Sequence, residues 1–125
     1  MTSTARAGLG RAGEALARRH LEALGYVCIA TNWRCRVGEL DLVMRDGDCI
    51  VFVEVKTRRG EETGRAEEGV TEGQAQRVLA SAEWFLAERP DLADLVWRID
   101  VVAITLNRRG VVVRVTHWPN ALVLG

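Results

Sequence analysis

Three acidic residues, Glu39, Asp41 and Glu54, stand at alternate positions in two neighbouring apolar segments, residues 38–43 and 50–56. Both segments are rich in Val, Ile and Leu, a composition that predicts β-strands. Because side chains alternate between the two faces of a strand, we expect all three carboxylates on one face of a hairpin. Like charges placed in this way repel each other, and a divalent cation would remove the repulsion. Ligands that are all oxygen atoms favour Mg²⁺ or Mn²⁺.

The residues between these segments predict the hairpin turn, because Asp-Gly at positions 46–47 is a strong signal for a two-residue loop. With that turn, Arg45 pairs with Asp48, and Asp41 becomes a diagonal neighbour of Glu54 across the two strands. Their backbones are then about 7–8 Å apart. The acidic side chains would therefore gather at one spot that is able to hold a divalent ion.

Lys56 is expected on the same face, two positions after Glu54, and it is the only lysine among 17 basic residues. A chain that uses arginine everywhere else and lysine here indicates a need for a compact point charge with several donors. The plain alternative is an ion pair between Glu54 and Lys56 on an exposed strand end, worth ~0–1 kcal/mol.

Glu14 lies in a segment, Leu9 to Leu24, whose apolar residues follow a helical period. Gly10 and Gly13 weaken the first turns of this helix by roughly 1 kcal/mol each, which is more sensible if another part of the chain approaches the backbone there. The plain alternative for Glu14 is a solvated carboxylate near a helix N-terminus.

Arginines border the acidic strands at Arg34, Arg36, Arg58 and Arg59. They suit contacts to phosphates, and they suit solvated loop charges equally well. The formal net charge of +0 argues against a histone-like basic protein but leaves room for a local basic patch. His20 and His117 are expected to be surface or core histidines, and a histidine-rich metal cluster is excluded by their small number.

The length of 125 residues and the apolar content of 48% predict one folded domain over residues 1–125. Three cysteines without Cys-x-x-Cys spacing indicate free thiols in a reducing cytoplasm. We expect neither a signal peptide nor a membrane span, because no segment approaches the roughly 20 apolar residues that a span needs.

The expected order of elements is helix, three strands, helix, two strands, which is a mixed α/β sheet flanked by helices. We expect residues 1–8 to be frayed and residues 57–69 to form a mobile loop beside the site. The strand after the second helix should run parallel to the strand before it. Besides the elements already given, the expected ranges are a strand over 26–33, a helix over 71–88 with Thr71 and Gln74 as its capping box, and strands over 97–106 and 111–118.

Three motifs in order, Gly10-x-x-Gly13-Glu14, residues 38–43 (GELDLV) and residues 51–58 (VFVEVKTR), resemble the YraN-like family. This bacterial group is placed in the PD-(D/E)xK nuclease superfamily, close to archaeal Holliday-junction resolvases. The resemblance covers nearly the whole chain, through residues 98–102 and 117–121. It implies a restriction-endonuclease-like core, a metal-dependent endonuclease acting on DNA, branched DNA included, and Mg²⁺ or Mn²⁺ as cofactor.

The resemblance also implies roles for single residues. Asp41 and Glu54 would be metal ligands, Lys56 the catalytic lysine that orients water or stabilises charge, and Glu14 an accessory acid. Glu39 matches the family motif. A homodimer would suit the cutting of both strands, by analogy with resolvases.

One residue departs from the family pattern. Gln74 stands at the start of the second helix, where family members usually carry a basic residue, most often lysine. Glutamine cannot supply a positive charge to a phosphate, and it serves the helix cap instead. This departure keeps open a second hypothesis, a nuclease-fold protein that binds nucleic acid or assembles with a partner without cutting.

Overall fold

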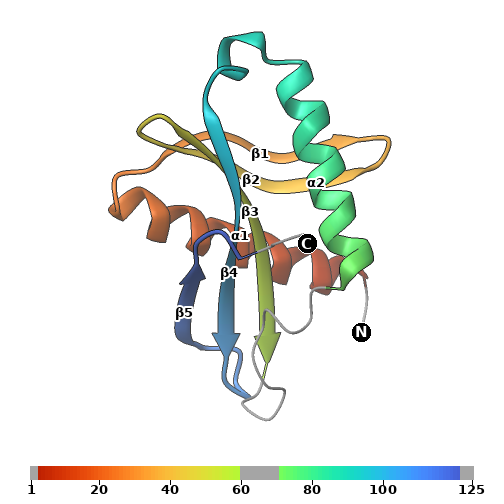
Figure 1. Cartoon of the computed structure of the whole chain (residues 1–125). Helices are drawn as coiled ribbons and strands as arrows, with labels where there is room; N and C mark the ends of the chain where they lie inside the picture. The colour runs from red at the N-terminus through yellow and green to blue at the C-terminus, as the bar shows by residue number, and fades with distance from the viewer. Residues whose placement is uncertain (1–2, 60–70, 122–125) are drawn as a thin grey trace.

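The computed structural model describes residues 3–59 and 71–121 and confirms the expected order of helices and strands (Figure 1). A short 3₁₀ turn before the fourth strand is an addition to that order. The elements are α1 (Ser3–Ala23), β1 (Val27–Cys35), β2 (Gly38–Asp46), β3 (Cys49–Arg59), α2 (Glu72–Ala87), η2 (Pro90–Leu92), β4 (Val96–Leu106) and β5 (Val112–Trp118).

The strands form one mixed sheet in the order β1-β2-β3-β4-β5. Strands β1, β2 and β3 are antiparallel neighbours, β3 and β4 are parallel, and β4 and β5 are antiparallel. The parallel pair confirms the prediction from the helical crossover. In Figure 1, β1 and β2 run across the direction of β4 and β5, so the sheet is strongly twisted and β3 passes through both halves.

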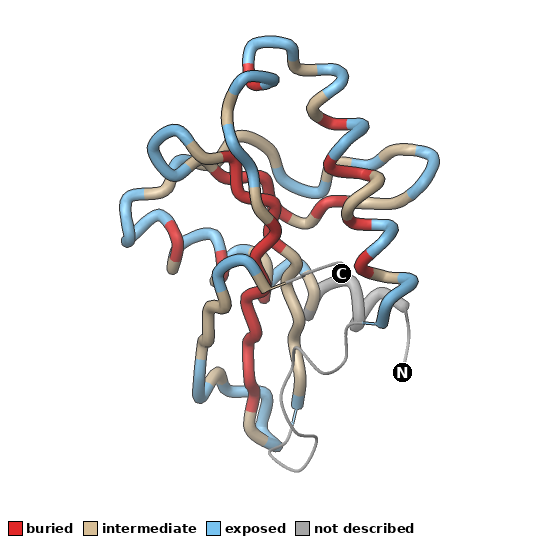
Figure 2. Tube along the Cα trace, in the orientation of Figure 1, coloured by how far each residue is buried: buried red, intermediate tan, exposed pale blue. Residues whose placement is uncertain are grey.

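Each face of the sheet has its own apolar cluster. One cluster joins Ala17 and Leu21 of α1 to the sheet, and the other joins Val78, Ala82 and Phe85 of α2. Strand β3 contributes to both, and its residues 50–53 are buried without exception, as their apolar sequence predicted (Figure 2). The two helices therefore pack against opposite faces of β3.

Two boundaries differ from the sequence-based expectation. Helix α1 begins at Ser3, so residues 3–8 are helical where we expected a frayed end. Strand β3 continues to Arg59, so residues 57–59 of the expected loop belong to the sheet, where they pair with residues 104–106 of β4. Residues 60–69 of that loop lie outside the described part of the chain.

The register of the β2–β3 hairpin corrects a prediction. Asp46 pairs with Cys49, so the turn residues are Gly47 and Asp48, and the expected pairing of Arg45 with Asp48 is wrong. Gly47 has φ +59° at the first turn position, where a hairpin turn that needs positive φ favours glycine. The register moves by two positions, and an even shift does not by itself turn a side chain to the other face of the sheet.

A buried ionic network links β4 to His117 and Asn120 on the α1 side of the sheet. Asp100 is 0% exposed, and its Oδ1 accepts hydrogen bonds from Arg98 Nε at 2.9 Å and from the Asn120 backbone N–H at 2.8 Å. His117 Nε2 lies 2.7 Å from Asp100 Oδ2, and Arg98 Nη2 donates to the Tyr26 hydroxyl. His117 is thus a core histidine with a structural partner.

All three cysteines are free thiols, as their spacing predicted. In the described ranges, neither helix combines the length and the apolar character that crossing a membrane requires.

Candidate metal centre

Strand β2 is distorted at Asp41, where the candidate site begins. Residues two apart in a regular strand lie on the same face of the sheet. Leu40 packs on the α2 side and Leu42 on the α1 side, so the alternation of side chains is broken between them. The ladder between β2 and β3 stops at Leu42–Val53. Beyond it, Asp41 Oδ2 accepts a hydrogen bond from the Val55 N–H at 2.8 Å. The Asp41 carboxylate thus replaces a strand carbonyl and holds β3 beside it.

Asn32 of β1 stands opposite Asp41 and was missed by the sequence analysis. It lies between two paired positions of the β1–β2 ladder and has φ +50°, a left-handed conformation that asparagine tolerates better than most residues. Its side chain favours the charged form of Glu14 and so opposes the rise in the pKa of that carboxyl. The available signal was an asparagine inside a predicted strand, where this residue type is depleted.

Glu14 reaches the site because α1 approaches β3 closely at Gly13. A Cβ atom on Gly13 would collide with Thr57 Oγ1, whereas one on Gly10 would meet nothing within 4 Å. The expectation of a close approach is therefore confirmed for Gly13 and wrong for Gly10. The absence of a side chain at Gly13 lets the next residue of the helix, Glu14, lie over the edge of β2.

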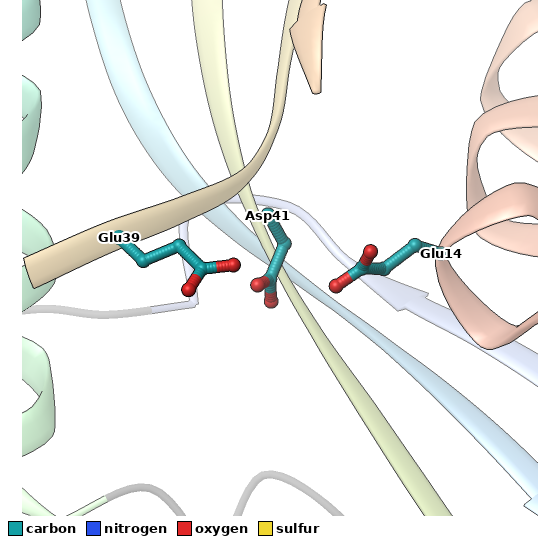
Figure 3. Close-up of side chains that lie close together, drawn as sticks. All are labelled: Glu14, Glu39 and Asp41. Atoms are coloured by element: carbon teal, nitrogen blue, oxygen red, sulfur yellow. The ribbon is translucent and has the colours of Figure 1, made fainter. Parts of the chain in front are cut away.

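Three carboxylates from two elements converge at this point (Figure 3). One oxygen each from Glu14, Glu39 and Asp41 lie within 4.8 Å of one another. Asp41 is in the middle, with Glu39 of β2 on one side and Glu14 of α1 on the other. Residues far apart in the sequence, at positions 14 and 39–41, thus form one acidic cluster.

Glu14 and Asp41 have a raised pKa, so each holds its proton more tightly than an isolated carboxyl does. Burial, and next the charge of Asp41, raise the pKa of Glu14 from 4.5 to about 7, against the opposing hydrogen bond from Asn32. Burial also raises the pKa of Asp41, although the hydrogen bond from the Val55 N–H favours its charged form. The site is therefore destabilised when all its carboxylates are ionised without a cation.

Glu54 and Lys56 of β3 form an ion pair beside this cluster. Their Oε1 and Nζ atoms are 3.5 Å apart, and the side chains are only 18% and 20% exposed, so the pair is not the exposed strand-end pair of the plain alternative. Burial, and next the charge of Asp41, raise the pKa of Glu54 to about 7, while Lys56 opposes the shift. Glu54 is thus close enough to Asp41 for the two charges to interact, but it is not one of the three residues whose oxygens lie within 4.8 Å of one another.

The residues present fit a hard divalent cation. All donors in the acidic cluster are carboxylate oxygens, the ligand type that Mg²⁺ and Mn²⁺ prefer. A bound dication would also offset the repulsion that raises the pKa of Glu14. Asp41 together with Glu14 and Glu39 would hold it, with Glu54 on the adjoining strand, so the pair Asp41 and Glu54 stays a prediction to which the structure adds two candidate ligands.

The four predicted phosphate-binding arginines have different surroundings. Arg34 Nε lies 3.4 Å from Glu39 Oε2, so this arginine compensates a candidate ligand. Arg36 is exposed just after β1. Arg58 and Arg59 line a hollow of about 240 Å³ together with Lys56 and Thr57. Lys56 therefore connects the acidic site to a basic surface at the end of β3.

Gln74 is used by the cap of α2, as the sequence predicted. Its side-chain Oε1 accepts the Thr71 N–H at 3.0 Å, and its own N–H donates to Thr71 Oγ1 at 3.1 Å. This reciprocal pair is a capping box. The side-chain amide oxygen of Gln74 is therefore already used as a hydrogen-bond acceptor at the start of α2.

Comparison with known proteins gives a consistent picture. The model of the uncharacterised protein family UPF0102 matches residues 13–104. A UPF0102 protein of Roseiflexus castenholzii is 46% identical over 118 residues, which is 94% of each chain. UPF0102 proteins of Frankia casuarinae and Pelotomaculum thermopropionicum are 48% and 44% identical over 90% and 94% of this chain, and over 94% and 97% of their own. The names of these relatives assign no activity.

Proposed function

This chain belongs to the uncharacterised protein family UPF0102, the YraN-like group, and on that premise we propose that it is a metal-dependent endonuclease that hydrolyses DNA phosphodiester bonds. The observation that carries the proposal is the meeting of Glu14, Glu39 and Asp41 within 4.8 Å, next to the buried Glu54–Lys56 pair. Carboxylates that can hold a divalent cation, with an ammonium group beside them, suit phosphodiester hydrolysis, which needs an activated water and stabilisation of negative charge on the phosphate.

The fold supports the same proposal. The resemblance to the YraN-like group implies a PD-(D/E)xK core, in which an Asp on one strand and a Glu-x-Lys on the next form the centre. Here Asp41 lies on β2, and Glu54 and Lys56 lie on β3, with Asp41 bonded directly to the backbone of β3 at Val55. The two strands are thus fixed to each other at the site.

The residues have distinct roles in this proposal. Asp41, with Glu14, Glu39 and Glu54, would hold Mg²⁺ or Mn²⁺. A bound dication supplies an activated water and neutralises charge on the phosphate. Lys56, fixed by its ion pair with Glu54, orients that water or stabilises the negative charge that develops on the phosphate. Arg58 and Arg59, next along β3, bind the DNA backbone without reading its sequence.

A second function has a specific observation in its favour. Gln74 replaces the basic residue that is usual in the family, and its side chain is engaged by Thr71. A non-catalytic protein that binds nucleic acid or assembles with a partner would tolerate this replacement.

Branched DNA as the preferred substrate and a homodimer as the active form are parts of the endonuclease proposal, by analogy with resolvases.

Cleavage assays separate the two functions. Purified protein is incubated with single-stranded, linear duplex and four-way-junction DNA, with Mn²⁺ or with EDTA. The endonuclease proposal predicts Mn²⁺-dependent cuts that fall by about 10²-fold or more in Glu54→Ala and Lys56→Ala, since each removes a group that acts on the reacting phosphate. Binding of DNA without any cuts, and without an effect of these substitutions, would establish the second function. Thermal unfolding of each variant shows that the loss is not a loss of folding.

A further inference from the structure

A second hollow lies beside Glu14, between α1 and strands β1 and β2. Its volume is about 200 Å³. Glu14 belongs both to this hollow and to the acidic cluster, so the two adjoin each other. We call it the α1 hollow; its lining residues are Arg11, Glu14, Ala15, Arg18, Thr31, Asn32 and Leu42.

Two guanidinium groups border the α1 hollow, and neither was among the arginines singled out from the sequence. Arg11 and Arg18 are seven residues apart on α1, which is close to two helical turns, so both project to the same side, about 10 Å apart along the axis. Glu14 lies between them in the sequence. Any group that occupies the hollow therefore meets two positive charges and lies beside the candidate metal centre.

These guanidinium groups are open to an anionic ligand. Arg11 is exposed. Arg18 Nε lies 3.2 Å from Glu22 Oε2, but the two side chains are 45% and 40% exposed, and a pair of this kind is weak. A guanidinium offers two parallel N–H donors to a phosphate, so a phosphodiester competes well for Arg18. Thr31 and Asn32, both exposed, add polar groups on the opposite wall.

We propose that the α1 hollow binds the phosphate backbone of the DNA strand that is cut, with Arg11 and Arg18 contacting phosphates next to the one that reacts. The proposal rests on the proposed function for the identity of the strand. It names a binding surface on α1 that is separate from Arg58 and Arg59 at the end of β3. The acidic cluster repels a polyanion, and basic groups adjoining it on the helix offset that repulsion.

The test measures DNA binding under conditions in which no cutting occurs. Anisotropy of labelled four-way-junction and linear DNA is titrated in EDTA and in Ca²⁺ at several KCl concentrations. The double variant Arg11→Gln/Arg18→Gln is expected to bind about five- to tenfold more weakly at low salt, and the slope of log K against log salt should fall by about 1–2. Arg19→Gln is the matched control, because Arg19 is exposed on the same helix and does not line the hollow. The control should change affinity less than twofold.

The outcomes separate this inference from the proposed function. If the wild-type protein binds DNA but never cuts it, and the double variant still loses affinity and salt dependence, the surface stands and the endonuclease proposal fails. If the wild type cuts DNA and the double variant binds and cuts like the wild type, the surface is wrong and the endonuclease stands. An equal loss in Arg19→Gln, or displacement of the DNA by millimolar inorganic phosphate alone, also overturns the surface.

A single charge reversal guards against a folding artefact. Arg11→Glu leaves the Arg18–Glu22 pair intact and should weaken DNA binding more than Arg11→Gln does, because it adds repulsion. Unfolding temperatures of all variants are compared with the wild type. Unchanged binding by a folded Arg11→Glu protein would overturn the inference.

Discussion

Asp41 has two partners of different kinds, a backbone N–H and a group of carboxylates. Its Oδ2 accepts the Val55 N–H at 2.8 Å, and its oxygens lie within 4.8 Å of those of Glu14 and Glu39. The hydrogen bond joins β2 to β3, and the group of carboxylates forms the candidate metal centre. Substitutions that keep one and remove the other can separate them.

Asp41→Asn and Asp41→Ala both remove the charge, but only asparagine keeps an oxygen that can accept the Val55 N–H. Alanine leaves this part-buried donor without an acceptor, so we expect Asp41→Ala to be less stable than Asp41→Asn by about 1–2 kcal/mol. Urea unfolding of the two metal-free variants measures the difference. Equal free energies of unfolding would show that the carboxylate does not support the strand junction.

Glu14 gives the metal-free protein a pH dependence. Its pKa is raised from 4.5 to about 7, so between these values the folded state holds a proton that the unfolded state has released. The free energy of unfolding in EDTA should therefore fall as the pH rises from 4.5 to 7. Glu14→Gln should remove part of this fall and gain roughly 1 kcal/mol at pH 8, a figure reduced for the partial exposure of the group. Urea unfolding at pH 5 and pH 8 tests this, and a wild-type stability that rises over the same range would contradict it.

At the scale of the elements, α1 and β3 are held together where Gly13 meets Thr57. The sequence showed that Gly10 and Gly13 were unusual for a helix, but it could not show which of them faced another element. The structure singles out Gly13, because a Cβ atom there would collide with Thr57 Oγ1. Thr57 is β-branched, so its hydroxyl cannot move away freely. This contact sets how far Glu14 extends over β2.

The two glycines form a matched pair for mutagenesis. Gly13→Ala should destabilise the protein by about 1–3 kcal/mol through overpacking, whereas Gly10→Ala should stabilise it by about 0.5–1 kcal/mol through helix propensity. The added methyl group meets nothing within 4 Å at position 10. Thermal unfolding measures both. Adding Thr57→Ala to Gly13→Ala should recover part of the loss, and a loss that does not respond to Thr57 would refute the contact.

Helix α2 and the β2–β3 hairpin show which features could be predicted from the sequence and which could not. Thr71 and Gln74 lie close in the sequence and predicted the capping box, which the structure confirms. The hairpin was predicted, but its register was wrong, because Asp46-Gly47-Asp48 offers Asp-Gly and Gly-Asp as alternative turn pairs that differ by one residue. Local signals identify an element more reliably than they choose between two such neighbouring turns.

At the scale of the whole molecule, the candidate site depends on contacts between distant parts of the chain. Strand alternation predicted a group of Glu39, Asp41, Glu54 and Lys56, but the alternation is broken between Leu40 and Leu42, and only Glu39 and Asp41 of these four belong to the acidic cluster. The position of Glu14 beside Asp41 could not be predicted in this way, because it depends on how α1 packs across the sheet. The distortion at Asn32 was also hidden, since a left-handed residue inside a strand is set by its tertiary surroundings.

The buried network around Asp100 and Arg98 links β4 to Tyr26, His117 and Asn120. Arg98→Met leaves Asp100, which is 0% exposed, without its guanidinium partner, and we expect a loss of about 3–5 kcal/mol. Arg89→Met is the control, because the Arg89–Asp91 pair is exposed to solvent and contributes little to stability. Urea unfolding compares the two variants, and similar small losses in both would show that the network does not hold the fold together.

The central claim is that acids from α1, β2 and β3 gather to hold a divalent ion. Titration of Mn²⁺ into metal-free protein, followed by calorimetry, tests it most directly. We predict saturable binding in the wild type, binding at least about tenfold weaker in Asp41→Asn, which keeps the hydrogen bond to β3, and no change in Asp91→Asn, an exposed aspartate outside the site. Absence of Mn²⁺ binding by the wild type, or equal binding by Asp41→Asn, would contradict the claim.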